Sequence, residues 1–323
     1  MTGSSADDSR HCLVIANPQA GGLTSDLVAD VGQRCARHGA VQVQRTYSRG
    51  DATRIAQAAA ALPPRQRFRV VVAVGGDGTV LEVVRGLLAG GASATGPALF
   101  VVPAGTGNSN YRSHWGTWPW QQALDYALAD PDRSARPLDL ARVRELDEPV
   151  VLGAGAGLTA EVLRSAGEVQ LAGRARLQAG LERAAASFTP YAGRVTVDGR
   201  VVHEGDTVFA NVGGGRHRAW QYLVLPASVL DDGQLDVCVV GVGVDPVDVP
   251  ALLLDGKHVG RPGVVYERGR SVVVERTDGL PLVFEHDGEL LRHDRSRLTV
   301  DVLPRALPVL CQPVLAAAGQ ETP

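Results

Sequence analysis

An unbroken run of apolar residues that ends in a glycine-rich turn constrains this chain more than any other feature. Residues 70–74 (VVVAV) are mostly β-branched, the turn GGDGT follows at 75–79, and apolar residues then recur at helical spacing over 80–88. The pattern predicts a buried strand, a tight turn and an amphipathic helix. Because glycines let a ligand approach the backbone and the first amides of a helix are free, this turn favours an anion, most often phosphate.

The acidic residue inside this turn alters the expected chemistry. Any α/β protein contains strand-to-helix turns, so a glycine pair alone is equally well explained by structure. Asp77 would repel a bare phosphate, but it can hold one through Mg²⁺ or orient a reacting hydroxyl. Thr79 and Glu82 also stand at the spacing of a capping box, which marks the start of a helix. The sequence therefore predicts a phosphate-binding turn with a functional carboxylate.

The first part of the chain alternates strands with helices. Strands are expected at 11–17, 41–47, 70–75 and 98–102, with helices at 23–38, at 51–61 and after the glycine turn. This alternation predicts an α/β N-terminal domain with a doubly wound parallel sheet. Polar loops with glycine follow three of the strands. Ligands of such sheets bind beyond the carboxyl ends of the strands, so we expect the three loops to form one phosphate site.

Short strands separated by turn signals replace this alternation beyond about residue 137. They are expected at 138–144, 150–154, 194–202, 207–212, 235–242, 271–276, 282–286 and 298–303. They predict a β-rich C-terminal domain that is mostly antiparallel and sandwich-like. We therefore expect a nucleotide-binding α/β domain over 1–135 and a β-rich substrate and metal domain over 136–310. Whether the C-terminal segment 311–323 returns to the first domain is left open.

Composition excludes several classes of protein. The net charge is −3 and no block of lysine and arginine occurs, which argues against nucleic acid as a partner. The four cysteines lack metal or redox spacing and are expected as buried thiols in a reducing compartment. No run approaches the roughly 20 apolar residues of a membrane span, and residues 1–10 lack the apolar core of a signal peptide. We expect a soluble, cytoplasmic protein.

Two stretches have both a structural and a lipid-contacting interpretation. The sequence WGTWPW at 115–120 favours aromatic packing on the sheet edge over a lip that contacts substrate. Arginines on the two expected helices at 158–188 favour a solvated face over docking on an anionic membrane, although such surfaces do attract cationic faces. The sequence alone leaves both alternatives open.

Two acidic motifs lie in the expected β-rich domain. Asp231-Asp232-Gly233 and Asp287-Gly288-Glu289 are each explained by a tight turn between strands. Adjacent carboxylates with open carbonyl groups nearby also suit a hard cation. Two carboxylates on either side of a glycine can divide the work of phosphoryl transfer, one accepting a proton and the other holding Mg²⁺. His286, beside the second motif, is expected to be incidental.

Taken in order, these motifs resemble the diacylglycerol kinase catalytic family, which includes bacterial lipid kinases and sphingosine and ceramide kinases, and which shares Gly-Gly-Asp-Gly-Thr with the related NAD kinases. The resemblance spans most of the chain. The motifs that carry it are Asn17-Pro18 with Gly21, Thr46 with Gly50-Asp51-Ala52, Gly75-Gly76-Asp77-Gly78-Thr79 with Glu82, Pro103-x-Gly105-Thr106-x-Asn108, Gly155-x-Gly157, Pro226 with Asp231-Asp232-Gly233, and Asp287-Gly288-Glu289.

The resemblance implies ATP and Mg²⁺ in a cleft between the two domains. It makes Asp287 the general base for the acceptor's hydroxyl and places Glu289 close to Mg²⁺, whereas some members give the base role to the aspartate matching Asp77. It also implies a structural Mg²⁺ site made by the side chain of Asp232 with the carbonyls of Val229 and Gln234. The residues it places at ATP are Asn17, Pro18, Gln19, Ala20, Gly21, Thr46, Gly75, Gly76, Asp77, Gly78, Thr79, Val80, Leu81 and Thr106.

The chain departs from the family pattern near the acceptor. Residues 109–112 (SNYR) stand where the family has an aspartate followed by apolar and aromatic residues, and 211–217 match only loosely. The resemblance implies a kinase of a lipid-like alcohol, of diacylglycerol or sphingoid type, in lipid metabolism and phospholipid biosynthesis. Peripheral contact with a membrane and a homodimer are left open. The alternatives are a kinase of a non-membrane alcohol in specialised metabolism and a catalytically silent nucleotide-binding protein. The retained acids Asp77, Asp287 and Glu289 argue against the silent protein.

Overall fold

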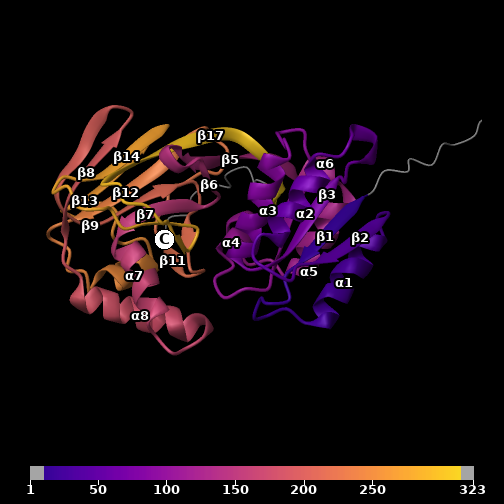
Figure 1. Ribbon diagram of the computed structural model, residues 1–323, viewed down its shortest axis with the longest axis horizontal. Helices are drawn as coiled ribbons and strands as arrows, with labels where there is room; N and C mark the ends of the chain where they lie inside the picture. The colour runs from indigo at the N-terminus through magenta and orange to yellow at the C-terminus, as the bar shows by residue number, and fades with distance from the viewer. Residues whose placement is uncertain (1–10, 314–323) are drawn as a thin grey trace, which may run out of the picture.

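The computed structural model describes residues 11–313 and has two domains (Figure 1). The core of the N-terminal domain is a parallel sheet in the order β2-β1-β3-β4. The strands are β1 (Cys12–Ala16), β2 (Val41–Arg45), β3 (Val70–Gly75) and β4 (Ala98–Pro103). The helices are α1 (Ser25–Ala36), α2 (Asp51–Ala60), α3 (Asp77–Ala89), α4 (Ser109–Trp115), α5 (Trp120–Ala129) and α6 (Pro131–Ser134), and a short 3₁₀ turn spans Pro64–Gln66.

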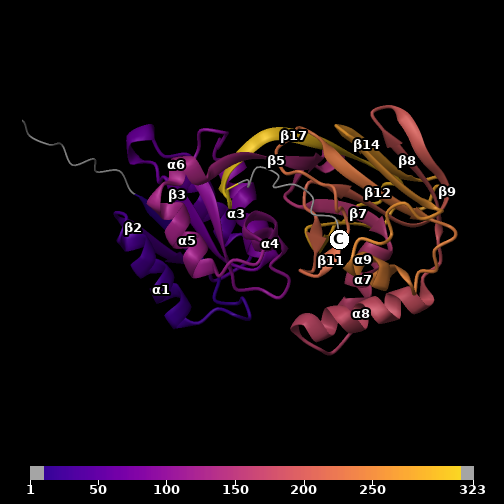
Figure 2. The same cartoon turned by 180° about the vertical axis from the view of Figure 1, so that it is seen from behind.

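Helices cover both faces of this sheet, as expected of strands that read as continuous apolar runs. Helix α2 packs against α3, and α1 packs against α5 on the opposite side (Figures 1 and 2). The strands β1 and β3 are buried along their whole length. The doubly wound α/β domain predicted from the sequence is therefore confirmed.

The C-terminal domain is built from antiparallel strands. Its strands are β5 (Ala135–Val143), β6 (Glu148–Val150), β7 (Gly153–Gly157), β8 (Tyr191–Val197), β9 (Arg200–Gly213), β12 (Leu235–Gly241), β13 (Val264–Gly269), β14 (Ser271–Arg276), β15 (Phe284–His286), β16 (Glu289–Leu290) and β17 (Arg297–Leu310), with a separate ribbon of β10 (His217–Arg218) and β11 (Tyr222–Leu223) and a 3₁₀ turn at Arg144–Leu146. Its helices are α7 (Leu158–Gly167), α8 (Gly173–Ser187) and α9 (Val249–Leu254). The predicted β-rich domain is confirmed.

Strand β17, the yellow strand of Figure 1, joins the two domains. It pairs antiparallel with β5 and β14, and its end lies parallel to β4, with Val309 opposite Leu99. Leu310 and Cys311 are buried in the core of the N-terminal domain. The chain thus returns to the first domain through β17, before residue 311, and residues 314–323 of the predicted C-terminal segment lie outside the described residues.

The three polar loops of the N-terminal domain, the first at 17–22, the second at 75–79 and the third at 103–108, meet at one edge of its sheet, as predicted. The amide of Gly22 donates to the carbonyl of Ala104 at 2.8 Å, which ties the first loop to the third. The second and third loops meet at two glycines, because a Cβ atom on Gly105 would lie 2.3 Å from Cα of Gly76. Only glycine permits this approach of two backbones.

The start of α3 differs from the sequence prediction. The helix begins at Asp77, and Gly76 occupies the N-cap without a side-chain hydrogen bond, three residues before Thr79, the N-cap that the capping box indicated. The hydroxyl of Thr79 instead accepts a hydrogen bond from Nδ2 of Asn17 at 2.9 Å. The spacing of Thr79 and Glu82 was misleading because Thr79 connects two loops rather than capping its own helix.

The tryptophan-rich stretch packs inside the N-terminal domain. Trp115 is fully buried, and its ring lies 5.6 Å from that of Phe100 and 5.8 Å from that of Trp118. This is the aromatic packing that the sequence favoured. Within residues 11–313, none of the helices combines the length and the apolar character that crossing a membrane requires.

Candidate active site

A polar groove of about 540 Å³ lies over the carboxyl edge of the parallel sheet. Val80 and Leu81 do not line it, because both are buried in the core below. Gly75 supports the groove from beneath, since a Cβ atom there would lie 2.4 Å from the hydroxyl of Thr79. Most of the residues that the resemblance places at ATP line this groove: Asn17, Gln19, Ala20, Gly21, Thr46, Gly76, Gly78, Thr79 and Thr106.

Asp77 faces away from this groove and holds the first turn of α4. Its Oδ2 accepts the amide of Ser109 at 3.1 Å, and its Oδ1 accepts the amide and the Nδ2 of Asn110 at 3.0 and 2.9 Å. A carboxylate at a helix N-terminus is stabilised by the free amides and the helix dipole. Asp77 therefore couples the glycine turn to the third loop, and residues 109–110, which depart from the family pattern, are its partners.

An apolar cavity of about 740 Å³ lies on the other side of Asp77. Aliphatic and aromatic side chains of α7, α8, α9 and β9 form most of its wall, including Leu163, Leu181, Phe209 and Leu253. Its polar end carries Asp77, Arg218, Glu285 and Asp287. The cavity and the groove share Gly78 and Thr106 as lining residues, so the two spaces meet at the glycine turn.

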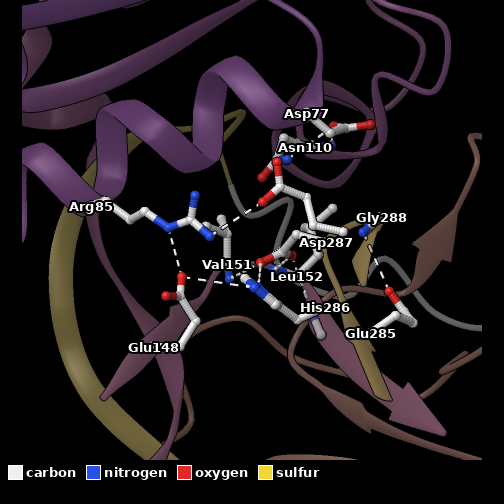
Figure 3. A network of polar contacts seen from close by, with 12 residues as sticks. Asp77, Arg85, Asn110, Glu148, Val151, Leu152, Glu285, His286, Asp287 and Gly288 are labelled. Atoms are coloured by element: carbon white, nitrogen blue, oxygen red, sulfur yellow. Dashed lines mark hydrogen bonds and ion pairs between the residues drawn. The ribbon is translucent and has the colours of Figure 1, made fainter. Parts of the chain in front are cut away.

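Asp287 lies in a tight turn after β15, with φ of 48°, and its side chain is completely buried. Its Oδ2 accepts the amide of Val151 at 2.8 Å, and its Oδ1 accepts those of Leu152 and Gly153 at 2.7 and 3.3 Å (Figure 3). Burial alone would raise the pKa of Asp287, but the hydrogen bond and charge of His286 and the two strongest amide bonds outweigh it and lower the pKa. Asp287 is therefore a stably ionised carboxylate.

Glu289 is held by two arginines of the N-terminal domain. Its Oε2 lies 2.8 Å from Nη2 of Arg49 and 3.4 Å from Nη2 of Arg85. Arg85, on α3, also contacts Oε1 of Glu148 at 2.6 Å, and the same oxygen lies 3.7 Å from Nε2 of His286 (Figure 3). The acidic motif of the second domain is thus joined to the first domain across the groove.

Sequence reasoning missed four charged residues of this region. Arg49 lines the groove and Arg85 reaches it, whereas Arg218 and Glu285 stand at the polar end of the cavity. Arg49 could have been found from its place inside the turn that follows Thr46. Glu285 could have been found because it is an acidic residue within the expected strand at 282–286, two residues before Asp287.

The predicted metal site of the second domain has its acid already paired. The carboxylate of Asp232 forms an ion pair with Arg268, and its Oδ1 accepts the amide of Gln234 at 3.1 Å. A guanidinium thus stands where Mg²⁺ would have to bind, and as these side chains lie they do not fit the ion. Within residues 11–313, no cluster of three or more His, Cys, Asp or Glu side chains could hold a metal. The site of Val229, Asp232 and Gln234 stays a prediction.

Comparison with family models identifies both halves of the chain. Residues 11–143 match the diacylglycerol kinase catalytic domain, and residues 153–311 match the YegS C-terminal NAD kinase beta sandwich-like domain. A "Probable lipid kinase YegS-like" of Pseudomonas aeruginosa (strain UCBPP-PA14) is 31% identical over 315 residues, which cover 95% of this chain and 98% of the relative. One of Pseudomonas fluorescens (strain Pf-5) is 30% identical and covers 89% of this chain and 91% of the relative.

Solved structures agree on the fold. A diacylglycerol kinase from Bacillus anthracis str. Sterne is similar with a TM-score of 0.69 at 19% identity, over 94% of this chain and 97% of that one. An NAD kinase from Archaeoglobus fulgidus in complex with ATP is similar with a TM-score of 0.53 at 12% identity, over 93% of each chain. Given these matches over nearly its whole length, the chain belongs to the family of YegS-like lipid kinases, phosphotransferases with an alcohol group as acceptor.

Proposed function

We propose that this protein transfers the γ-phosphoryl group of ATP to the hydroxyl of a lipid-like alcohol, of diacylglycerol or sphingoid type. The observation that carries the proposal is the junction at Gly78 and Thr106, where a polar groove with glycine loops meets a large apolar cavity. A kinase of an amphipathic alcohol needs this combination, because a charged donor and an apolar acceptor must meet at one point.

The groove suits the triphosphate of ATP. The glycine turn and the first amides of α3 offer backbone donors for phosphate oxygens, and Arg49 adds a guanidinium at the rim. Glu82 and Glu289 line the same groove and are hard oxygen donors of the kind that Mg²⁺ binds. When bound there with the nucleotide, Mg²⁺ would neutralise charge on the transferring phosphoryl group.

The cavity suits an alkyl chain with its hydroxyl at the polar end. In the transfer, the acceptor's oxygen forms a bond to the γ-phosphorus, the bond to the bridging oxygen breaks, and ADP departs with that electron pair. A carboxylate beside the hydroxyl takes the proton. The resemblance assigns this role to Asp287, and that assignment stays a prediction.

Exposed side chains on or next to the helices that wall the cavity support peripheral contact with a bilayer. Leu171, in the loop between α7 and α8, and Leu254, the last residue of α9, are exposed apolar side chains. Arg174 and Arg176 line the cavity from the first turn of α8. Exposed apolar side chains beside arginines favour binding to an anionic membrane surface, from which a lipid acceptor could enter.

A transfer assay with radiolabelled ATP tests the proposed function. The acceptor panel contains a diacylglycerol and a sphingoid base in mixed micelles, and short water-soluble alcohols without detergent. We expect a labelled lipid phosphate, identified by mass. A Leu181→Trp variant, which fills the cavity, should lose lipid transfer while it still binds ATP, whereas Leu280→Trp, at an exposed site outside both spaces, should change neither. Transfer to the soluble alcohols alone would favour the non-membrane alternative.

A further inference from the structure

Strand β7 consists of glycine and alanine alone. Its sequence from 153 to 157 is GAGAG, and all five residues are buried. Glycine inside a strand costs stability, and it commonly marks a place where a ligand or another group comes close to the backbone. Gly153 and Gly155 lie on one face of β7, because alternate residues of a strand share a face. The two glycines therefore leave a hollow over this face.

Polar side chains from three elements occupy the hollow over Gly153 and Gly155. Arg218 comes from β10, Asn211 from β9 and Thr159 from α7. A Cβ atom on Gly153 would overlap the guanidinium of Arg218. One on Gly155 would lie 2.7 Å from Nδ2 of Asn211 and 2.9 Å from Oγ1 of Thr159. The absence of side chains on β7 is thus what makes room for these three polar groups.

Each of the three side chains has a buried polar atom without a partner. Within residues 11–313, Nδ2 of Asn211, Oγ1 of Thr159 and Nε of Arg218 make no hydrogen bond. The rest of the guanidinium is paired, since Nη1 donates to the carbonyl of Gly215 at 2.8 Å and Nη2 donates to Oδ1 of Asn211 at 3.1 Å. Buried polar atoms are nearly always paired in native proteins, and an unpaired one costs stability. A further group, from a ligand or a water, is needed to complete the hollow.

The three unpaired atoms define the chemistry of that group. The amide nitrogen of Asn211 and Nε of Arg218 can only donate a hydrogen bond, and the hydroxyl of Thr159 can donate as well. The missing group must therefore offer lone pairs, as a carbonyl oxygen does. An ammonium group has donors only, so the amine of a free sphingoid base could not pair with these atoms.

The hollow borders the cavity and lies close to the acidic turn after β15. Thr159 and Arg218 line the cavity. The amide of Asp287 donates to the carbonyl of Gly153 at 3.0 Å, and Gly155 is two residues further along β7, or roughly 7 Å. In an acylated glycerol the ester carbonyl is only a few bonds from the free hydroxyl. A carbonyl group in the hollow would therefore keep that hydroxyl within reach of Asp287.

We propose that Thr159, Asn211 and Arg218 form a subsite for an acyl carbonyl oxygen of the acceptor, an inference that rests on the proposed function. The subsite selects an alcohol that carries an acyl ester, as diacylglycerol does, over a free sphingoid base. Phe209 lines the cavity two residues before Asn211 and on the same face of β9. The hydrocarbon part of the acyl chain therefore continues from the subsite along the apolar wall.

Two acceptors that differ only in their carbonyl groups test the subsite. A diacylglycerol and the matched dialkylglycerol ether have the same chains and the same free hydroxyl, but the ether has methylene groups in place of the carbonyls. With labelled ATP and mixed micelles, kcat/KM of the wild type should be about 10- to 100-fold higher for the ester than for the ether. Thr159→Val removes the hydroxyl with little change of shape and should lower this preference about fivefold. Thr159→Ser keeps the hydroxyl and should keep most of the preference.

Two comparisons exclude a merely structural effect. Thr196→Val, on β8 and outside the cavity, should show the full preference of the wild type. The unfolding temperature of Thr159→Val should not fall, because the hydroxyl has no partner to lose. A marked fall would contradict the unpaired hydroxyl on which the subsite depends.

Three results of the transfer assay would overturn the subsite and leave the proposed function intact. One is an equal kcat/KM for ester and ether in the wild type, which would mean that a water pairs with these atoms instead. Another is a preference for the ester that Thr159→Val retains in full. The third is faster transfer to a free sphingoid base than to the ester. A wild-type protein that phosphorylates no alcohol would overturn the proposed function and this inference together.

Discussion

Asp77, the first residue of α3, and Asn110, in the first turn of α4, are 33 residues apart in the sequence and are joined by two hydrogen bonds. One oxygen of Asp77 accepts both the backbone amide and the side-chain amide of Asn110, at 3.0 and 2.9 Å. Asn110 is fully buried. Asp77 therefore fixes the third loop against the second. Because both loops line the junction between groove and cavity, Asp77 also fixes that junction.

Removal of this link should weaken both stability and turnover. Asn110→Ala deletes one hydrogen bond to a charged oxygen and leaves a small void, so we expect a loss of about 2 kcal/mol in the free energy of unfolding. Urea denaturation measures it. Ser93→Ala, whose hydroxyl makes only an exposed 3.4 Å contact with Thr95, serves as control. Equal stability of the two variants would contradict the structural role of Asp77.

The contact between Gly76 and Gly105 predicts a steric effect on ATP binding. A Cβ atom at position 105 would overlap the backbone of Gly76, so Gly105→Ala must push the second and third loops apart, at a cost of about 1–3 kcal/mol. ATP affinity, measured by calorimetry, should fall with it. Gly167→Ala, where a Cβ atom meets nothing within 4 Å, should behave as the wild type. An unaffected Gly105→Ala protein would rule out close packing of the loops.

Arg49 should contribute to ATP affinity through its charge. It is exposed at the rim of the groove and pairs with Glu289, so its guanidinium can exchange that carboxylate for a phosphate oxygen. We expect Arg49→Ala to weaken ATP binding by about tenfold, or about 1.4 kcal/mol. The difference from wild type should shrink as salt is added. Arg65→Ala, on the exposed 3₁₀ turn, is the control, and similar affinities for both variants would remove Arg49 from the nucleotide site.

The buried acid Glu285 predicts a stability that falls as pH rises. Burial raises its pKa from the usual 4.5 of a glutamic acid to about 7 in the folded protein, so the folded state holds this proton to higher pH than the unfolded state does. Stability is therefore lost between about pH 4.5 and pH 7, by an amount on the order of 3 kcal/mol. Glu285→Gln should remove this component, becoming more stable than wild type at pH 8. Parallel pH profiles of unfolding for the two proteins would contradict the buried, protonated acid.

The ion pair of Asp232 with Arg268 predicts the response to Mg²⁺ without nucleotide. Because the guanidinium occupies the carboxylate, added Mg²⁺ should leave the unfolding temperature of the wild type unchanged. Arg268→Ala frees the carboxylate and should make the unfolding temperature rise with Mg²⁺. A marked rise in the wild type would instead support the structural Mg²⁺ site that the resemblance implies at Val229, Asp232 and Gln234.

Particular residues show which parts of the fold and the site can be predicted from sequence patterns. The apolar run at 70–74 and the alternation around it predict the parallel sheet, and the resemblance to the kinase family implies that Asn17, Thr46 and Thr106 lie together at the nucleotide; all three line the groove. Local patterns could not show contacts between distant segments. The partner of Thr79 is Asn17, 62 residues away, and the arginines that hold Glu289 come from the other domain. The spacing of Thr79 and Glu82 indicated a helix cap, because the spacing of residues along the chain carries no information about contacts between distant segments.

The apolar cavity also could not be predicted from the sequence. Its wall combines α7, α8, α9 and β9, which are separated along the chain, and apolar residues in each element read only as ordinary core. Glu285 was overlooked because Asp287, beside it, carried the recognisable motif. Hydrogen bonds distinguish the two buried acids, and those of Asp287 come from the backbone at 151–153, more than 130 residues earlier.

The most direct test of this account is transfer of labelled phosphate from ATP to a lipid alcohol by the wild type and by Leu181→Trp. Groove and cavity meet at Gly78 and Thr106. We therefore predict a labelled lipid phosphate from the wild type and a large loss in the variant, with ATP affinity unchanged. Equal lipid transfer by the two proteins, or no labelled lipid from either, would contradict the cavity as the acceptor's site.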